Sequence, residues 1–154
     1  MNSKNTTLIS WTAVILWLVL IFYFSSQPAT ESAALSSSIT EVVVEKAIIL
    51  TPLEREDITE DLLSNIHLFI RKFAHFTVYF ILGILITNAF TVTGIKGKKR
   101  LIYSLIFCVI YAITDEFHQT FVPGRSGQIT DVLIDSFGSL AGIFTYIKTS
   151  HKFK

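Results

Sequence analysis

Apolar residues are grouped along the chain into four long runs that are separated by polar segments. The runs cover approximately residues 8–24, 69–90, 101–120 and 129–147. An α-helix rises about 1.5 Å per residue, so roughly 20 mainly apolar residues cross a membrane core about 30 Å thick. Because the runs are close to this length, the pattern predicts an all-α, polytopic membrane protein with a bundle of four transmembrane helices.

The first run has an alternative interpretation as a cleaved signal peptide, because it follows Lys4 near the N-terminus. However, it is longer than the apolar core of a signal peptide, which has about 7 to 15 residues. No cleavage site of the small-x-small type follows it. These features favour an uncleaved membrane anchor.

Residues 25–68 form the longest connection between two runs. Apolar residues recur at helical spacing over 39–50 and again over 58–70, which predicts two amphipathic helices. The second helix is expected to lead directly into the 69–90 span. A helix of this kind typically lies at the membrane interface and packs on the bundle. A lid over a substrate site is the alternative interpretation.

The composition supports a membrane protein, because 51% of the residues are hydrophobic and 16% are charged. Soluble domains have about 25% charged residues. The length of 154 residues suits a single membrane domain over 1–154. Cys108 is the only cysteine, so an intrachain disulfide and a cysteine-based zinc site are excluded. No P-loop, nucleophile elbow or basic aromatic surface is present, and nothing indicates nucleic-acid binding.

The distribution of basic residues predicts the orientation, since Lys and Arg in short loops are retained in the cytoplasm. With a cytoplasmic N-terminus, eight of the thirteen basic residues lie inside. They are Lys4, Lys96, Lys98, Lys99, Arg100, Lys148, Lys152 and Lys154. The twelve acidic residues then lie outside or in the outer halves of the spans. We therefore predict that both termini are cytoplasmic and that 25–68 is extracytoplasmic.

Ionisable residues interrupt the last three runs near their outer ends. A charged residue at a helix centre costs about 2.5 to 3.5 kcal/mol on insertion scales, so these side chains should face the protein interior or a wet cavity. The candidates for acid, base or metal chemistry are His75, Asp115, Glu116, His118, Asp131 and Asp135. The candidates for substrate binding are Arg71, Lys72, Tyr79, Gln119 and Arg125.

Helical spacing brings most of these residues onto shared faces, because positions three and four apart are neighbours on a helix. The faces carry Lys72, His75 and Tyr79 in the second run, Tyr111, Asp115, His118 and Gln119 in the third, and Asp131, Asp135, Gly138 and Gly142 in the fourth. Glu116 is turned by about 100° from Asp115. The GSLAG pattern of the fourth run is typical of close helix packing. Three helices are thus expected to contribute to one polar layer.

Arg125 lies at the tip of the predicted turn VPGRSG. Backbone N–H groups of such a turn, followed by a helix N-terminus, suit an anion such as phosphate. Alternatively, Arg125 extends to lipid headgroups or pairs with Asp131. His75 and His118 have three open interpretations: acid–base chemistry with a carboxylate, structural ion pairing, or ligation of a divalent metal, for which no diagnostic spacing is present.

Three motifs carry a resemblance to a known family: FSSQP at 24–28, RKFAHFTVYFILG at 71–83 and YAITDEFHQTFVPGRSGQITDVLIDSFGSLAG at 111–142. With them the chain resembles the VanZ-like family of small bacterial membrane proteins. The family is named for a member associated with resistance to the glycopeptide teicoplanin. The resemblance implies a place in the bacterial cell membrane and a role in the envelope or in antibiotic tolerance. It implies no particular reaction or substrate.

Two functions remain open from the sequence. One is binding of an anionic lipid, a lipid-linked cell-wall precursor or a glycopeptide at the outer membrane face. The other is an outer-leaflet enzyme, a lipid phosphate hydrolase or transferase, that uses His75 or His118 as acid or base. A proton-coupled transporter is less favoured, because the inner halves of the runs contain few polar residues. The sequence identifies neither a cofactor nor a protein partner.

Overall fold

The computed structural model describes the backbone of residues 3–50 and 58–152, and this part of the chain is helical without strands. The helices are α1 (Ser3–Ser25), α2 (Ala29–Leu50), α3 (Glu60–Val92), α4 (Gly97–Gln119) and α5 (Ile129–Lys152). The predicted all-α fold is therefore confirmed for the described residues.

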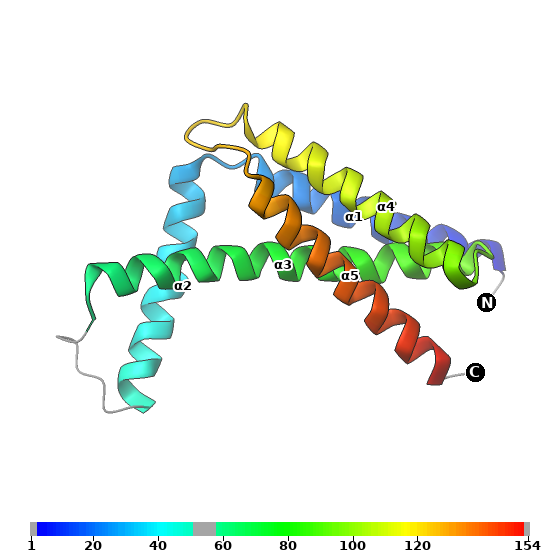
Figure 1. The fold of residues 1–154 in the computed structure, drawn as a ribbon, viewed down its shortest axis with the longest axis horizontal. Coiled ribbons are helices and arrows are strands. Elements are labelled where there is room, and N and C mark those ends of the chain that lie inside the picture. Colours follow the sequence, from blue (N-terminus) through cyan, green and yellow to red (C-terminus); the bar gives the residue numbers. More distant parts are fainter. Residues whose placement is uncertain (1–2, 51–57, 153–154) are drawn as a thin grey trace.

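Four of the helices run between the same two ends of the molecule (Figure 1). The terminal end contains the first residues of α1 and the last residues of α5 (Figure 1). The loop end contains the α1–α2 connection and the turn between α4 and α5, and there α2 crosses over α3 (Figure 1). The polar residues of the predicted layer lie toward the loop end.

Three of the described helices are long and apolar enough to cross a membrane, whereas the sequence pattern predicted four spans. These helices are α1, from Lys4 onward, α3 and α4. The predicted span at 129–147 is a helix, α5, but its mean hydropathy is too low for it to be counted among them. The reason is that α5 carries Asp131 and Asp135, which are 5% and 0% exposed. Inward-facing carboxylates lower the average hydropathy of a helix without facing lipid.

Of the two helices predicted for the long connection, α2 extends further than the sequence indicated, and α3 begins close to its predicted position. α2 begins at Ala29, well before the predicted 39–50 stretch. α3 begins at Glu60, where the Thr59 side chain accepts a hydrogen bond from the backbone N–H of Leu62. The predicted amphipathic stretch 58–70 therefore continues into the 69–90 span as one helix, as expected, while residues 51–57 lie outside the described part.

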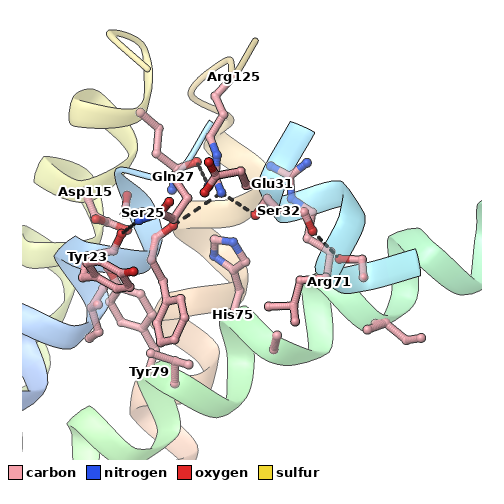
Figure 2. Close-up of a pocket in the computed structure, with 18 of the residues that line it drawn as sticks. Tyr23, Ser25, Gln27, Glu31, Ser32, Arg71, His75, Tyr79, Asp115 and Arg125 are labelled. Carbon is pink, nitrogen blue, oxygen red and sulfur yellow. Dashed lines mark hydrogen bonds between the residues drawn. The ribbon is translucent and has the colours of Figure 1, made fainter. Parts of the chain in front are cut away.

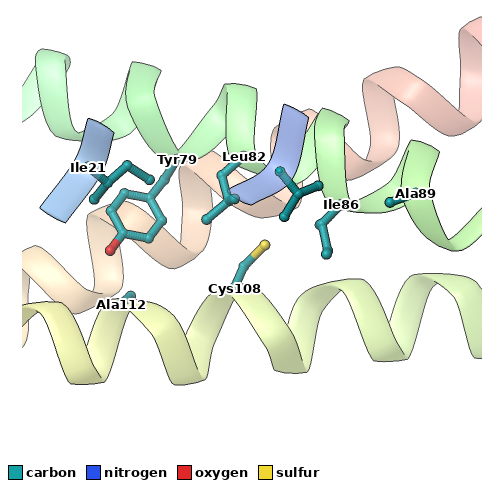
Figure 3. Packing of buried hydrophobic residues seen from close by; sticks show 8 residues of the cluster. Ile21, Tyr79, Leu82, Ile86, Ala89, Cys108 and Ala112 are labelled. Carbon is teal, nitrogen blue, oxygen red and sulfur yellow. The ribbon is translucent and has the colours of Figure 1, made fainter. Parts of the chain in front are cut away.

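The core is formed where α1, α3 and α4 meet (Figure 3). Its buried residues are Val14 and Ile21 of α1, Tyr79, Leu82, Ile86 and Ala89 of α3, and Cys108 and Ala112 of α4. In a membrane, close packing and interhelical hydrogen bonds stabilise such contacts more than the hydrophobic effect does. The Trp17 indole N–H donates to the Val78 carbonyl at 3.0 Å and holds α1 on α3.

Glycines allow α5 to approach α3 closely. A Cβ atom at Gly138 would collide with the carbonyl oxygen of Phe76, and one at Gly142 would collide with that of Phe80. The interpretation of GSLAG as a helix-packing pattern is therefore confirmed. Gly138 follows Asp135 by about one turn, and Phe76 follows His75 directly, so this contact brings the two ionisable side chains together.

Candidate functional site

A cavity of about 400 Å³ lies at the loop end of the molecule (Figure 2). It lies between the end of α1, the first turns of α2, the middle of α3, the end of α4 and the turn that follows α4. Pockets that bind small molecules usually measure about 300 to 1,000 Å³. The cavity is therefore large enough for a lipid headgroup or one segment of an acyl chain.

The lining of the cavity is amphipathic. Apolar side chains on α1, α2 and α3 form much of the wall, namely Ile21, Phe24, Leu35, Ile39, Ile70, Ala74 and Val78. The polar lining includes Arg71, His75, Asp115, Gln119 and Arg125 (Figure 2). Such a cavity suits a molecule with a charged group and a hydrocarbon part.

Arg125 connects three segments of the chain at the polar side of the cavity. Its guanidinium donates to the Gln119 side-chain carbonyl at 3.1 Å and to the Ser32 hydroxyl at 2.5 Å. A third contact, to the backbone carbonyl of Phe24, measures 3.5 Å. Pairing of Arg125 with Asp131, one of the alternatives raised by the sequence, is not observed, because Lys72 pairs with that carboxylate at 2.9 Å. Arg125 instead turns inward over the cavity.

Arg71 lies near Arg125 and lines the same cavity (Figure 2). Burial and then the positive charge of Arg71 lower the pKa of Arg125, and the carboxylates of Asp115 and Glu116 partly oppose this shift. Within the described residues, no carboxylate oxygen lies within 4.0 Å of either guanidinium. Two guanidinium groups thus line one cavity without a carboxylate in direct contact.

A second group of ionisable side chains lies behind the cavity wall. The Nδ1 atom of His75 is 3.4 Å from an oxygen of Asp135, and His75 also lines the cavity. The Glu116 carboxylate accepts hydrogen bonds from the Gln119 side chain at 3.1 Å and from the backbone N–H of Gln128 at 2.9 Å. Ligand atoms of His75, Glu116 and Asp135 all lie within 4.8 Å of one another, so these three residues could hold a metal ion.

The structure divides the residues that the sequence selected into three groups. Arg71, His75, Tyr79, Asp115, Gln119 and Arg125 line the cavity. Lys72, Glu116, Asp131 and Asp135 lie outside the lining, in the interface of α3, α4 and α5. His118 lies apart, because its ring packs on Phe22 with centroids 4.7 Å apart.

Part of the site was not selected from the sequence. Ser25, Gln27, Glu31 and Ser32 line the cavity. Ser25 and Gln27 belong to FSSQP at 24–28, which contributed to the family resemblance. Neither side chain is charged, so neither was selected as a candidate site residue. α2 was interpreted mainly as an interfacial helix with a lid as the alternative; it packs on α3 and also forms one wall of the cavity.

Comparisons with known proteins identify the family of the chain. No curated protein and no solved structure matches it significantly. The family model described as VanZ/LLP1 matches residues 10–150, which include all five helices in whole or in large part. The chain therefore belongs to the VanZ/LLP1 family.

Proposed function

We propose that this protein binds an anionic lipid or a lipid-linked cell-wall precursor in the cavity at the loop end. The phosphate of the ligand contacts Arg71 and Arg125, and its hydrocarbon part lies against the apolar residues of α2 and α3. The observation that carries the proposal is the pair of neighbouring guanidinium groups at the polar side of an amphipathic cavity.

The electrostatics of the arginines favour a phosphate. Two like charges in a partly buried site repel each other, and an anion between them removes this repulsion. A guanidinium presents several N–H donors in a planar fork that matches the oxygens of a phosphate. Arg125 is already oriented by its hydrogen bonds to Gln119 and Ser32, so little conformational entropy is lost when the ligand binds.

The proposed orientation places the cavity at the outer face of the bacterial cell membrane. In this arrangement α5 is the fourth span, and both termini are cytoplasmic. Lys96 lies in the α3–α4 connection, and Lys98 and Lys99 lie in the first turn of α4, at the terminal end where α1 begins and α5 ends (Figure 1). Retention of basic segments in the cytoplasm supports this assignment. Cell-wall precursors and glycopeptides meet the membrane from the opposite side.

A direct binding measurement tests the proposal. The full-length protein in nanodiscs is titrated with phosphatidylglycerol, a polyprenyl phosphate, zwitterionic phosphatidylcholine and teicoplanin. We expect an anionic ligand to bind, and Arg125→Gln to weaken its binding at least tenfold. Lys98→Gln removes one positive charge from an exposed position outside the cavity and should change the affinity less than twofold.

The comparison of ligands identifies the source of the phosphate. Preference for phosphatidylglycerol indicates a membrane lipid, and preference for polyprenyl phosphate indicates a cell-wall precursor. Binding of teicoplanin alone indicates recognition of the antibiotic itself. Equal affinity of the wild type and Arg125→Gln for every ligand would contradict the proposal.

Tolerance of teicoplanin is the physiological role that we propose for this binding. Deletion of the gene should sensitise the native bacterium to the antibiotic, and the wild type should restore growth. Arg125→Gln should fail to restore it at an equal level of membrane protein. Restoration by this variant would separate the cavity from antibiotic tolerance.

An enzymatic function is the second candidate, and the contact between His75 and Asp135 favours it. A carboxylate that orients an imidazole at the wall of a ligand cavity is a common arrangement for acid–base catalysis. The reaction would be hydrolysis of a lipid diphosphate, in which water attacks the terminal phosphorus and the bridging P–O bond breaks. Release of inorganic phosphate that His75→Gln abolishes, with ligand binding retained, would establish it. Absence of turnover by the wild type leaves the binding function.

A further inference from the structure

The carboxylate of Asp135 is buried in a way that requires a positive partner. Asp135 is 0% exposed, and neither of its oxygens accepts a hydrogen bond from the described part of the chain. The nearest cationic candidate is His75, whose Nδ1 lies 3.4 Å away. This exceeds the distance of about 2.7 to 3.2 Å that is typical of N–H···O hydrogen bonds. A buried carboxylate without donors is strongly unfavourable.

Glu116 adds a second buried carboxylate to the same place. It is 4% exposed, and its hydrogen bonds from Gln119 and Gln128 fix its orientation. Within the described residues, the only carboxylate paired with a lysine or arginine is Asp131, which contacts Lys72. Glu116 and Asp135 therefore place two carboxylates close together without a lysine or arginine as partner. One dication would neutralise both.

We infer that His75, Glu116 and Asp135 form a binding site for one divalent cation. The inference goes beyond the proposed lipid binding and does not depend on it. One imidazole nitrogen and two carboxylate oxygens favour a metal of the manganese or zinc class over calcium or magnesium, which prefer oxygen ligands throughout. The three ligands come from α3, α4 and α5, so the ion also joins these helices.

The distances suit an ion shared by the three residues. Two ligands about 2.1 Å from a tetrahedral zinc ion lie about 3.4 Å apart. The separation of His75 Nδ1 and the Asp135 oxygen is 3.4 Å. The whole group lies within 4.8 Å, so the longest separation must shorten by a small side-chain rotation on binding. Because His75 also lines the cavity, the ion would lie directly behind its wall.

Titration with the metal alone tests the site. The full-length protein in detergent is stripped with a chelator and titrated with Mn²⁺, and then separately with Zn²⁺, without added lipid. We expect one ion per chain, and at least tenfold weaker binding by Asp135→Asn and by Glu116→Gln. Asp131→Asn is the matched control. Asp131 is a buried carboxylate one turn before Asp135 on the same helix, but it is already paired with Lys72. Its affinity should remain within about threefold of the wild type.

Two further readouts separate a lost site from a damaged fold. Bound Mn²⁺ should show magnetic coupling to an imidazole nitrogen, and His75→Gln should abolish this coupling. Mn²⁺ should raise the unfolding temperature of the wild type but not that of Asp135→Asn. In the presence of chelator, Asp135→Asn should be at least as stable as the wild type, because the unpaired buried charge is gone.

The inference is overturned if the wild type binds no ion saturably, or if Asp135→Asn and Glu116→Gln bind as well as the wild type. In that outcome the two carboxylates share a proton in place of a metal. Lipid binding through Arg71 and Arg125 is measured separately, so it can fail or succeed independently of the cation.

Discussion

Two groups of polar residues, one toward each end of the bundle, differ in how well they are satisfied. Toward the terminal end, the Asn88 amide donates to the Ser10 hydroxyl at 3.0 Å, and the Tyr146 hydroxyl donates to the Asn88 carbonyl at 2.9 Å. This triad is uncharged and joins α1, α3 and α5. At the loop end, by contrast, Arg71 and Arg125 lie together without a carboxylate within 4.0 Å, and Asp135 has no donor among the described residues.

We infer from this difference that polar residues serve two purposes in this membrane fold. A satisfied, neutral triad links helices and fixes their register. A charged layer with missing partners lowers the stability of the free protein, and such an arrangement is typical of ligand sites. If this distinction is correct, substitutions in the triad should affect stability alone, and substitutions of the unpaired residues Arg125 and Asp135 should affect ligand binding.

The largest effect is expected at the close contact between α3 and α5, on which both the triad and the charged layer depend. Gly142→Leu places a side chain against the Phe80 carbonyl and forces α5 away from α3. Overpacking of this kind typically costs about 1 to 3 kcal/mol, and backbone contact puts this position at the upper limit. Chemical unfolding in detergent should show the loss, and ligand affinity should fall with it.

The control for this variant is Thr145→Leu on the same helix, because Thr145 is exposed. It should change stability by less than about 0.5 kcal/mol. Equal losses of stability in Gly142→Leu and Thr145→Leu would mean that the close contact at Gly142 does not hold α5 against α3.

The ion pair between Lys72 and Asp131 should give the next largest effect. Lys72→Met leaves a buried carboxylate without its partner, and the expected loss is about 1 to 3 kcal/mol. The value lies below that of a fully buried pair, because the Lys72 side chain is 31% exposed. A double-mutant cycle with Asp131→Asn measures the pair: the second substitution should restore much of the stability. Additive losses would show that the two side chains do not interact.

The sequence could predict most of the helices but not all their limits. The runs at 8–24 and 101–120 correspond closely to α1 and α4. The start of α3 was predicted well, because the helical stretch 58–70 was expected to lead directly into the 69–90 span and the helix begins at Glu60; Arg71 and Lys72 interrupt the apolar run without interrupting the helix. Hydropathy marks the part of a helix that contacts lipid, and backbone hydrogen bonding continues beyond it. In the same way, the buried carboxylates of α5 lower its mean hydropathy below that of a membrane-spanning helix, although they do not interrupt the helix.

For the site, helical spacing predicted which residues share a layer but not which neighbour each contacts. Glu116, turned by about 100° from Asp115, indeed lies outside the cavity lining and near Asp135. His118 was expected on the face of Asp115, yet its ring packs on Phe22. Residues three apart differ by about 60° around a helix, which is enough to direct one side chain to the cavity and the other to α1.

The turn after α4 was the least predictable part of the site. Its residues favour a tight turn, but several conformations satisfy the same pattern. The direction of Arg125 depends on Gln119 and Ser32, which lie on two different helices, and no local spacing relates them. Such contacts follow from the packing of α2, whose extent the sequence did not reveal.

Substitution of Asn88 tests whether the triad affects stability without affecting ligand binding. The loss of stability should be smaller than that caused by breaking the ion pair. Asn88→Leu removes both interhelical hydrogen bonds of the triad and should cost about 1 to 2 kcal/mol. Because Asn88 lies outside the cavity lining, affinity for the anionic ligand should stay within twofold of the wild type. A tenfold loss of affinity with unchanged stability would reverse the assignment of the two ends.

The smallest effect is expected for Tyr146→Phe, which removes one hydroxyl and keeps the ring. The lost hydrogen bond to Asn88 should cost about 0.5 to 1.5 kcal/mol in unfolding experiments, since Asn88 retains its contact with Ser10. If the triad acts as a unit, Tyr146→Phe combined with Asn88→Leu should cost no more than Asn88→Leu alone, because the hydroxyl has already lost its partner. Full additivity would mean that each hydrogen bond acts independently. The triad would then be a set of separate contacts, each of which stabilises the packing of its own two helices.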